Sequence, residues 1–239
     1  KFKNGKASFT NKFVKTEGFL KEQKVGKFIY RGVFGTQKKG GVINNAFNLN
    51  LKNIANTHVI KLGDELLALW EAAGPHSLDP KNLETNGLTT LKGVLKKNEA
   101  FSAHPKVDFN SNSADEVLIT FGVQTGLTST IRLMEFSNSG ENSGKILFDR
   151  KDKLKGFAFL HDFAITTNWA IFLQNAIDFN PLPFVMGQKG AAQCLKSNPK
   201  KTAKFFIVPR DSGLFRGQPP IIIDAPEGFV FHHVNAYEN

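Results

Sequence analysis

The sequence predicts an all-β fold, and three observations support this prediction. Short strand-like stretches follow one another at intervals of about 8–12 residues, turn residues separate them, and helical periodicity is scarce. Sandwiches, barrels and propellers share these features, and without a clear internal repeat the pattern leaves all three open. A chain of 239 residues is long enough for one large all-β domain or two small ones.

The first half of the chain yields three expected strands. Residues 7–19 are expected to form the first strand, and four glycines indicate a loop over 30–41. Residues 53–60 and 66–71 read as two strands joined by a turn at Gly63-Asp64-Glu65.

The second half continues the pattern. Residues 117–123 and 128–136 are expected to pair as neighbouring strands, because both are rich in β-branched and aromatic residues. The other expected strands here are 145–148, 205–209, 220–225 and 229–237.

The stretch 156–174, GFAFLHDFAITTNWAIFLQ, organises the rest of the chain. Apolar residues alternate on both sides of the turn residues Thr166-Thr167-Asn168, which predicts a hairpin or two neighbouring strands with His161 in the first. Two further stretches place a histidine in similar company, His104 in FSAHPKVD and His232 in FVFHHVNAYE. Three histidines at strands or strand ends, without competing cysteines, suggest an imidazole-rich transition-metal site.

Composition narrows the functional class. The net charge is +10, but the lysines are scattered, so we expect a solvated surface that aids contact with an anionic membrane, and no nucleic-acid partner. The single cysteine, Cys194, fits a reducing compartment, and no apolar run approaches the roughly 18 residues of a membrane span. The 23 phenylalanines against two tyrosines are expected for an apolar cavity.

The segment Phe179–Met186 differs from the strands. Its two prolines exclude it from the middle of a sheet, so it is either a loop folded onto the core or an exposed apolar patch. The second interpretation predicts a peripheral membrane contact through Leu182, Phe184 and Val185.

Five ordered motifs carry a resemblance to a known family. The motifs are LLALWEAAGPHSLDP, AFSAHPKVD, GFAFLHDFAIT, FNPLPFV and FVFHHVNAYE. Together they resemble the carotenoid cleavage oxygenases, particularly the cyanobacterial apocarotenoid or carotenoid oxygenase type, from about Phe9 to Glu238. The resemblance implies a seven-bladed β-propeller, incomplete in this chain. Residues 1–239 are accordingly expected to be part of a single propeller domain, truncated at both ends.

The resemblance also implies one ferrous iron per chain, held by four histidines. His104, His161 and His232 match three of the ligands, whereas the fourth is expected beyond Asn239. Glu71 matches a carboxylate that accepts the far N–H of His161, and Thr57 matches a residue beside an open coordination position.

The chemistry of these residue types agrees with such a site. Four neutral imidazoles leave ferrous iron its full charge and open positions, one of which can take dioxygen. A carboxylate on the far N–H fixes the orientation of the ring and its tautomer. Trp70, Phe159 and Phe231 stand beside site residues and are expected to line a substrate cavity, although ordinary core packing explains any one of them equally well.

The expected activity is cleavage of a carotenoid or apocarotenoid double bond by dioxygen to aldehyde or ketone products, in a cytoplasmic protein peripherally associated with the membrane. This chain alone is expected to be inactive. The alternatives are a stilbene-cleaving enzyme, a retinoid isomerase, and an inactive propeller that binds a lipid or pigment. A phenolic substrate is disfavoured because Tyr30 and Tyr237 are the only tyrosines. His58 and His76 match no ligand and are expected to be exposed.

Overall fold

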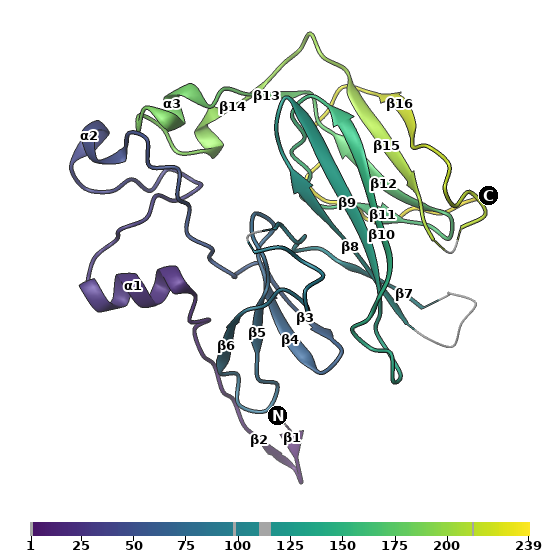
Figure 1. Ribbon diagram of the computed structural model, residues 1–239, viewed down its shortest axis with the longest axis horizontal. Helices are drawn as coiled ribbons and strands as arrows, with labels where there is room; N and C mark the ends of the chain where they lie inside the picture. The colour runs from purple at the N-terminus through teal and green to yellow at the C-terminus, as the bar shows by residue number, and fades with distance from the viewer. Residues whose placement is uncertain (1, 98, 110–115, 212) are drawn as a thin grey trace.

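The computed structural model describes residues 2–97, 99–109, 116–211 and 213–239. Within these residues the strands form three four-stranded antiparallel sheets and two smaller pairs (Figure 1). In the first two large sheets, strands that follow one another in the chain also lie side by side. The third sheet follows the same rule, except that β13 (Ile177–Phe179) and β14 (Leu195–Ser197) are inserted in the chain between its second and third strands. The all-β prediction is therefore confirmed.

The first sheet is a simple meander. Its strands are β3 (His58–Leu62), β4 (Glu65–Leu69), β5 (His76–Leu78) and β6 (Thr85–Leu88). The predicted turn between β3 and β4 is present, and Gly63 adopts a φ of 60° there, in the left-handed region that favours glycine. The first of these strands starts later than the sequence predicted, at His58.

The second sheet confirms the predicted pairing of residues 117–123 with 128–136. Its strands are β7 (Lys106–Asp108), β8 (Val117–Gln124), β9 (Thr128–Ser137) and β10 (Ile146–Lys155). Residue Val117 opposes Ser137, and Val123 opposes Ile131.

The third sheet contains the insertion. Its strands are β11 (Ala164–Ile165), β12 (Trp169–Gln174), β15 (Ala203–Pro209) and β16 (Ile221–Ala225). Between β12 and β15 the chain forms β13 (Ile177–Phe179), α3 (Leu182–Val185), a 3-10 turn (Ala192–Cys194) and β14 (Leu195–Ser197). Within the segment Phe179–Met186, Phe179 thus ends β13 and Leu182–Val185 form a short helix outside the sheets.

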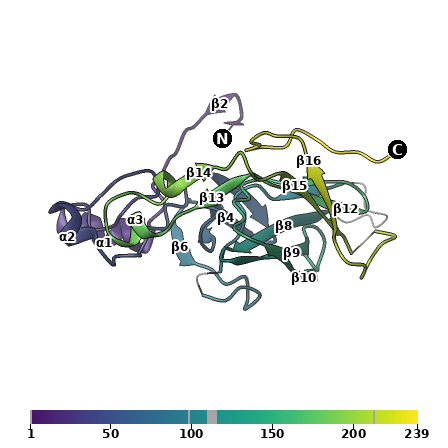
Figure 2. The ribbon, with the colours of Figure 1, turned by 90° about the horizontal axis from the view of Figure 1, so that it is seen from above.

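The N-terminal prediction of a strand over 7–19 was wrong. The elements here are β1 (Phe2–Lys3), β2 (Lys6–Ala7), α1 (Glu17–Val25) and α2 (Gly41–Asn45). Helix α1 begins where the Thr16 hydroxyl accepts the backbone N–H of Phe19, and it ends at Gly26 with a φ of 64°. The capping residues Thr16 and Gly26 thus favour a helix here more strongly than the alternating phenylalanines favour a strand. Figure 2 shows α1, α2 and α3 grouped at one end of the molecule.

One expected strand is shortened and another is absent. The hairpin predicted across Thr166-Thr167-Asn168 forms, with Ala164 opposite Ile171, but its first strand is limited to Ala164–Ile165 and does not include His161. Residues 157–163 and 229–237 run beside the sheets without joining a strand ladder. Ala158, Leu160 and Phe163 are nevertheless buried. Alternation of apolar residues therefore indicated burial here and not strand pairing.

The core lies between successive sheets, and β8 is buried on both faces. Ile119 and Phe121 pack toward the third sheet, whereas Leu118 packs toward the first. The second sheet is therefore covered on both sides, as a blade is by its neighbours in a stack of blades.

A buried arginine joins α2 to α3. Arg31 is fully buried, and its guanidinium donates hydrogen bonds to the carbonyls of Asn45, Asn48, Phe184 and Lys189. It also lies 4.1 Å from the centre of the Phe184 ring. Phe184 is consequently only 8% exposed, which corrects its assignment to an exposed apolar patch.

A second buried arginine joins the second and third sheets. Arg210 Nε lies 3.2 Å from Glu135 Oε1, Nη2 lies 2.8 Å from Asp108 Oδ2, and Nη1 donates to the carbonyl of Thr166. Burial raises the pKa of Glu135, although the charge of Arg210 acts in the opposite direction. The two sheets thus share one buried cation.

We expect Arg210→Met to destabilise the protein by about 3–5 kcal/mol, because it leaves buried carboxylates without their cation. Chemical denaturation of the variant and of the parent measures this difference. Arg216→Met is the matched control: Arg216 pairs with Asp211 but its side chain is 68% exposed, so a change of at most about 1 kcal/mol is expected. Equal losses in both variants would contradict a special role for the buried arginine.

Candidate metal centre

Three histidines from different parts of the chain converge. His104 and His161 lie just before β7 and β11, the first strands of successive sheets, and His232 lies in the irregular segment after β16. One ring nitrogen of each lies within 4.8 Å of the others, and His104 Nε2 is 2.8 Å from His161 Nε2. The segments that lead into the first strands of the second and third sheets therefore approach each other at the histidines.

Local hydrogen bonds place the segment that carries His104. The Ser102 N–H donates to the carbonyl of Phe121 at 2.7 Å, and the Ser102 hydroxyl accepts the N–H of His104 at 3.0 Å. A Cβ at Gly122 would lie 2.2 Å from the carbonyl oxygen of Ala100, so only glycine allows the segment to approach β8 this closely.

Side chains, in place of a strand ladder, hold the segments of the other two histidines. Before His161, the Ser129 hydroxyl accepts the N–H of Ala158 at 3.0 Å. Before His232, the amide side chain of Asn175 exchanges two hydrogen bonds with the backbone of Val230, at 2.9 and 3.0 Å. The irregular backbone is therefore fixed just before His161 and just before His232.

The donor set fits a transition-metal ion. Two ligands at right angles, each about 2.0–2.1 Å from an ion, are about 3 Å apart, close to the 2.8 Å between His104 Nε2 and His161 Nε2. Burial, followed by the nearby His161, lowers the pKa of His104, which favours the neutral imidazole that binds metals. Imidazole ligands suit iron, zinc, copper and nickel.

Glu71 supports one of the histidines. It follows β4, and its Oε1 lies 3.1 Å from Nδ1 of His161. Burial alone would raise the pKa of Glu71, but the hydrogen bond and charge of His161 outweigh it and lower that pKa. The ionised carboxylate accepts the Nδ1–H, which leaves Nε2 of His161 free to face the centre.

An apolar cavity of about 330 Å³ adjoins this carboxylate. Its lining includes Glu71 and the three aromatic residues predicted from the sequence, Trp70, Phe159 and Phe231. The Phe231 ring stacks on the His161 ring with centroids 3.9 Å apart. The cavity and the histidine cluster therefore share a wall.

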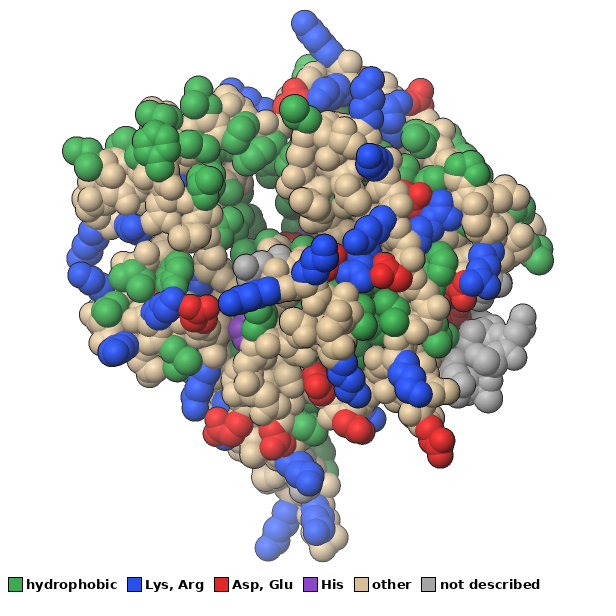
Figure 3. Space-filling model, viewed as in Figure 1, with side chains coloured by type: hydrophobic (Ala, Val, Ile, Leu, Met, Phe, Trp, Pro, Cys, Tyr) green, Lys and Arg blue, Asp and Glu red, His purple; other side chains and the backbone are tan. Residues whose placement is uncertain are grey.

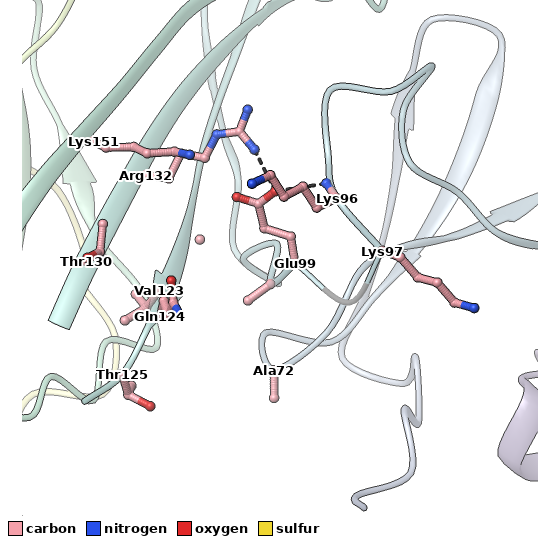
Figure 4. A pocket seen from close by; sticks show the side chains of 12 residues that line it. Ala72, Lys96, Lys97, Glu99, Val123, Gln124, Thr125, Thr130, Arg132 and Lys151 are labelled. Carbon is pink, nitrogen blue, oxygen red and sulfur yellow. Dashed lines mark hydrogen bonds and ion pairs between the residues drawn. The ribbon is translucent and has the colours of Figure 1, made fainter.

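A more polar cavity of about 480 Å³ lies on the other side of Ala72 and Val123, which line both cavities. Figure 4 shows Arg132 directed toward Glu99, and the two groups are 2.8 Å apart. Arg132 also pairs with Asp149 at 2.7 Å. The lining of this polar cavity contains no histidine among the described residues, so the cavity is not part of the metal centre.

The remaining predicted residues lie as follows. Thr57 is exposed just before β3, and its side chain contacts Asn56. His58 is exposed as expected, but its Nδ1 lies 3.0 Å from the carbonyl of Ala103, next to the metal centre. His76 was expected to be exposed and is 4% exposed, because β5 lies inside the first sheet between β4 and β6.

Sequence reasoning missed one polar group at the centre. Asp162, the residue after His161, accepts the backbone N–H of His233 at 2.9 Å. It also forms an ion pair with Lys106 at 2.8 Å. Charged residues directly adjacent to predicted ligands were the signal that could have revealed this contact.

Comparison with known proteins agrees with this geometry. The family model described as retinal pigment epithelial membrane protein matches residues 1–239. The chain belongs to the carotenoid oxygenase family. It is 46% identical to the apocarotenoid-15,15'-oxygenase of Synechocystis over 98% of the chain and 46% of that protein. It is also 29% identical to carotenoid 9,10(9',10')-cleavage dioxygenase 1 of Arabidopsis thaliana, over 100% of the chain and 44% of that protein.

More distant relatives in the family have other named activities. One is the resveratrol cleavage oxygenase 1 of Aspergillus fumigatus, 26% identical over 100% of the chain and 44% of that protein. The chain thus spans about half the length of the curated relatives that it matches.

Solved structures show the same fold. The cobalt-substituted Synechocystis apocarotenoid oxygenase superimposes with a TM-score of 0.89 at 46% identity, covering 95% of this chain and 46% of that one. That fold is a β-propeller, so the three large sheets of this carotenoid oxygenase chain are blades. Other solved variants of that oxygenase change a tryptophan, the glutamate after it, and a threonine. Trp70, Glu71 and Thr57 have the same spacing here.

We expect Glu71→Gln to weaken metal affinity or activity about 10–100-fold, because the substitution keeps an acceptor oxygen but removes the charge that supports His161. Titration with Fe²⁺ and the bound iron content measure the effect. Glu99→Gln, which removes an ion-paired carboxylate from the polar cavity, is the control and should leave metal affinity unchanged. A Glu71→Gln protein with the parent's iron content and turnover would show that this carboxylate is only structural.

Proposed function

We propose that the protein containing this chain is an iron(II)-dependent dioxygenase that cleaves a polyene double bond of a carotenoid or apocarotenoid. Dioxygen is the co-substrate, and the products are aldehydes or ketones. The observation that carries this proposal is the convergence of His104, His161 and His232 beside an apolar cavity. Membership of the carotenoid oxygenase family supports it.

Each group of the site has a defined task in this proposal. The three imidazoles would hold the iron, together with a fourth ligand from outside the described residues, and Glu71 fixes the ring of His161. Bound ferrous iron supplies the activation of dioxygen. The aromatic faces of Trp70, Phe159 and Phe231 shape a slot for a flat polyene and stabilise positive charge that develops along it.

The lining of the cavity favours a polyene over a phenol. Tyr237 is 81% exposed, and Tyr30 lines a different pocket, near α1. A phenolic hydroxyl in the apolar cavity would therefore find, among the described residues of its lining, only the side chains of Glu71 and Thr125 and the indole of Trp70 with a polar group. An apolar polyene loses no hydrogen bond on entry.

We expect His104→Ala, His161→Ala or His232→Ala to abolish iron-dependent cleavage, because each removes an imidazole that would hold the metal. Product masses from the full-length protein, assayed against a panel of carotenoids and apocarotenals, report the activity. His233→Ala is the matched control, since the bond to Asp162 comes from its backbone N–H and survives the substitution. His58→Ala is likewise expected to be tolerated. Full activity in the His232→Ala protein would refute the ligand assignment.

An inactive propeller that binds a pigment is the alternative from another class. It predicts that the full-length protein retains a carotenoid but yields no cleavage products in the presence of iron and dioxygen. The same assay therefore separates the two functions.

We further propose that the protein draws its substrate from a membrane surface. Carotenoid hydrocarbon is almost insoluble in water, and exposed apolar side chains gather over α2 and α3, at the upper left of Figure 3. Those on or beside the two helices are Val42, Ile43, Phe47, Leu182 and Met186. Val185 is half-buried beneath them, and its carbonyl accepts the N–H of Phe47 at 2.7 Å, which joins the two helices.

The composition of this apolar surface suits contact without insertion across the bilayer. The backbones of Lys38 and Lys39 are bonded to side chains of α2, and that of Lys189 is bonded to Arg31, so their ammonium groups can meet anionic headgroups beside this surface. Among the helices that the structure describes, none has the length and apolarity needed to cross a membrane.

We expect the double substitution Ile43→Asp and Leu182→Asp to reduce liposome binding and activity on membrane-embedded substrate, yet to spare activity on detergent-solubilised substrate. These side chains are 89% and 62% exposed, so folding should be preserved. Leu127→Asp, at a 99% exposed position on the β8–β9 turn, controls for loss of any exposed apolar group. Phe184→Asp should instead impair folding, because the ring is buried against Arg31. Unchanged liposome binding by the folded double variant would rule this surface out.

A further inference from the structure

Asp162, the residue after His161, has a buried carboxylate that contacts two other segments. Its side chain is 3% exposed, and Oδ1 lies 2.8 Å from Nζ of Lys106. Its Oδ2 accepts the backbone N–H of His233 at 2.9 Å. A carboxylate this deeply buried is retained only with such partners.

Both partners stand beside another of the proposed ligands. Lys106 begins β7 two residues after His104, and His233 directly follows His232. One carboxylate therefore joins the three chain segments that carry the three imidazoles.

The segment of His232 depends most on this contact, because residues 226–239 belong to no strand. Phe231, next to His232, stacks on the ring of His161, but the other described hydrogen bonds of this segment lie farther from the histidine. Val230 is bonded to the side chain of Asn175, and the carboxylate of Glu238 accepts from Asn168 at 2.6 and 3.0 Å. The buried carboxylate accepts the N–H next to His232, midway between these two attachments.

The charges around Asp162 also balance. Oδ1 of Asp162 faces the ammonium of Lys106, and Oδ2 accepts a backbone N–H. The ionised carboxylate neutralises the ammonium, which would otherwise repel a cation bound by the histidines. Asp162 contributes no atom to the described cluster of metal-binding groups, so its effect is exerted through its partners.

We propose that Asp162 is a positioning residue that sets the relative placement of the three imidazoles through Lys106 and the N–H of His233. This inference rests on the proposed metal centre. Its consequence is that metal affinity depends on a carboxylate that does not touch the metal.

Cobalt(II) titration of the full-length, metal-free protein tests this inference, because the visible absorption of bound cobalt reports ligand geometry as well as affinity. Asp162→Ala removes both contacts and is expected to weaken Co²⁺ binding about 10–100-fold and to change the absorption spectrum. Asp162→Asn keeps an acceptor for the N–H of His233, and Lys106→Met keeps that bond intact. Both should show a smaller loss.

Asp152→Asn is the matched control, since Asp152 is a half-buried partner of Arg150 on β10, outside the cluster. It should leave the affinity and the spectrum unchanged. Circular dichroism checks that each variant is folded. A folded Asp162→Ala protein with the parent's affinity and spectrum would overturn the inference. Where Asp162→Ala fails to fold, parental values in both Asp162→Asn and Lys106→Met overturn it equally.

One further variant separates failure of the inference from failure of the proposed function. If His104→Ala binds Co²⁺ as tightly as the parent, the metal centre itself is refuted, and the inference with it. If His104→Ala loses Co²⁺ whereas the Asp162 variants do not, the metal centre stands and only the positioning role is refuted.

Discussion

The structure depends on the convergence of three imidazoles on one point. Two ring nitrogens 2.8 Å apart, from His104 and His161, cannot both carry a proton without repulsion. At least one must be neutral with a free lone pair, which is the form that binds a metal. Burial lowers the pKa of His104 and so favours its neutral form, and the hydrogen bond between His161 Nδ1 and Glu71 selects the tautomer whose Nε2 faces the centre. The chain therefore prepares a ligand set through tautomer and protonation as well as through position.

Buried charges in this molecule join segments that no ladder connects. Arg31 binds carbonyls from α2 and α3, Arg210 links two blades, and Asp162 links the three histidine segments. Each of these charged groups contacts an opposite charge or the dipoles of backbone groups. Buried pairs add little net stability, because desolvation opposes the Coulomb attraction. What they provide here is fixed geometry at places where the backbone is irregular.

Local pattern predicted the structure where sequence neighbours decide it, and failed where distant residues do. Residues 117–136 formed the predicted hairpin, because strand propensity and the turn act within one short stretch. The first strand of the hairpin predicted within 156–174 forms only at Ala164–Ile165, because pairing needs a neighbouring strand, which alternation cannot report. Phe184 was assigned to the surface because the arginine that covers it lies 153 residues away. Residue chemistry alone suggested that the three histidines bind a metal. The pairing of His161 with Glu71 required the family resemblance, since 90 residues separate the two.

The apolar cavity and the metal centre share side chains, and this has a physical consequence. Glu71 lines the cavity and also bonds His161, whereas Phe231 lines the cavity and stacks on the same imidazole at 3.9 Å. The ring of His161 is thus held on its edge by a carboxylate and on its face by an aromatic ring. A ligand that shifts Phe231 must change the packing on that imidazole, because close-packed groups leave no free space between them. Placing the polyene and holding the metal are therefore tasks of one packed unit.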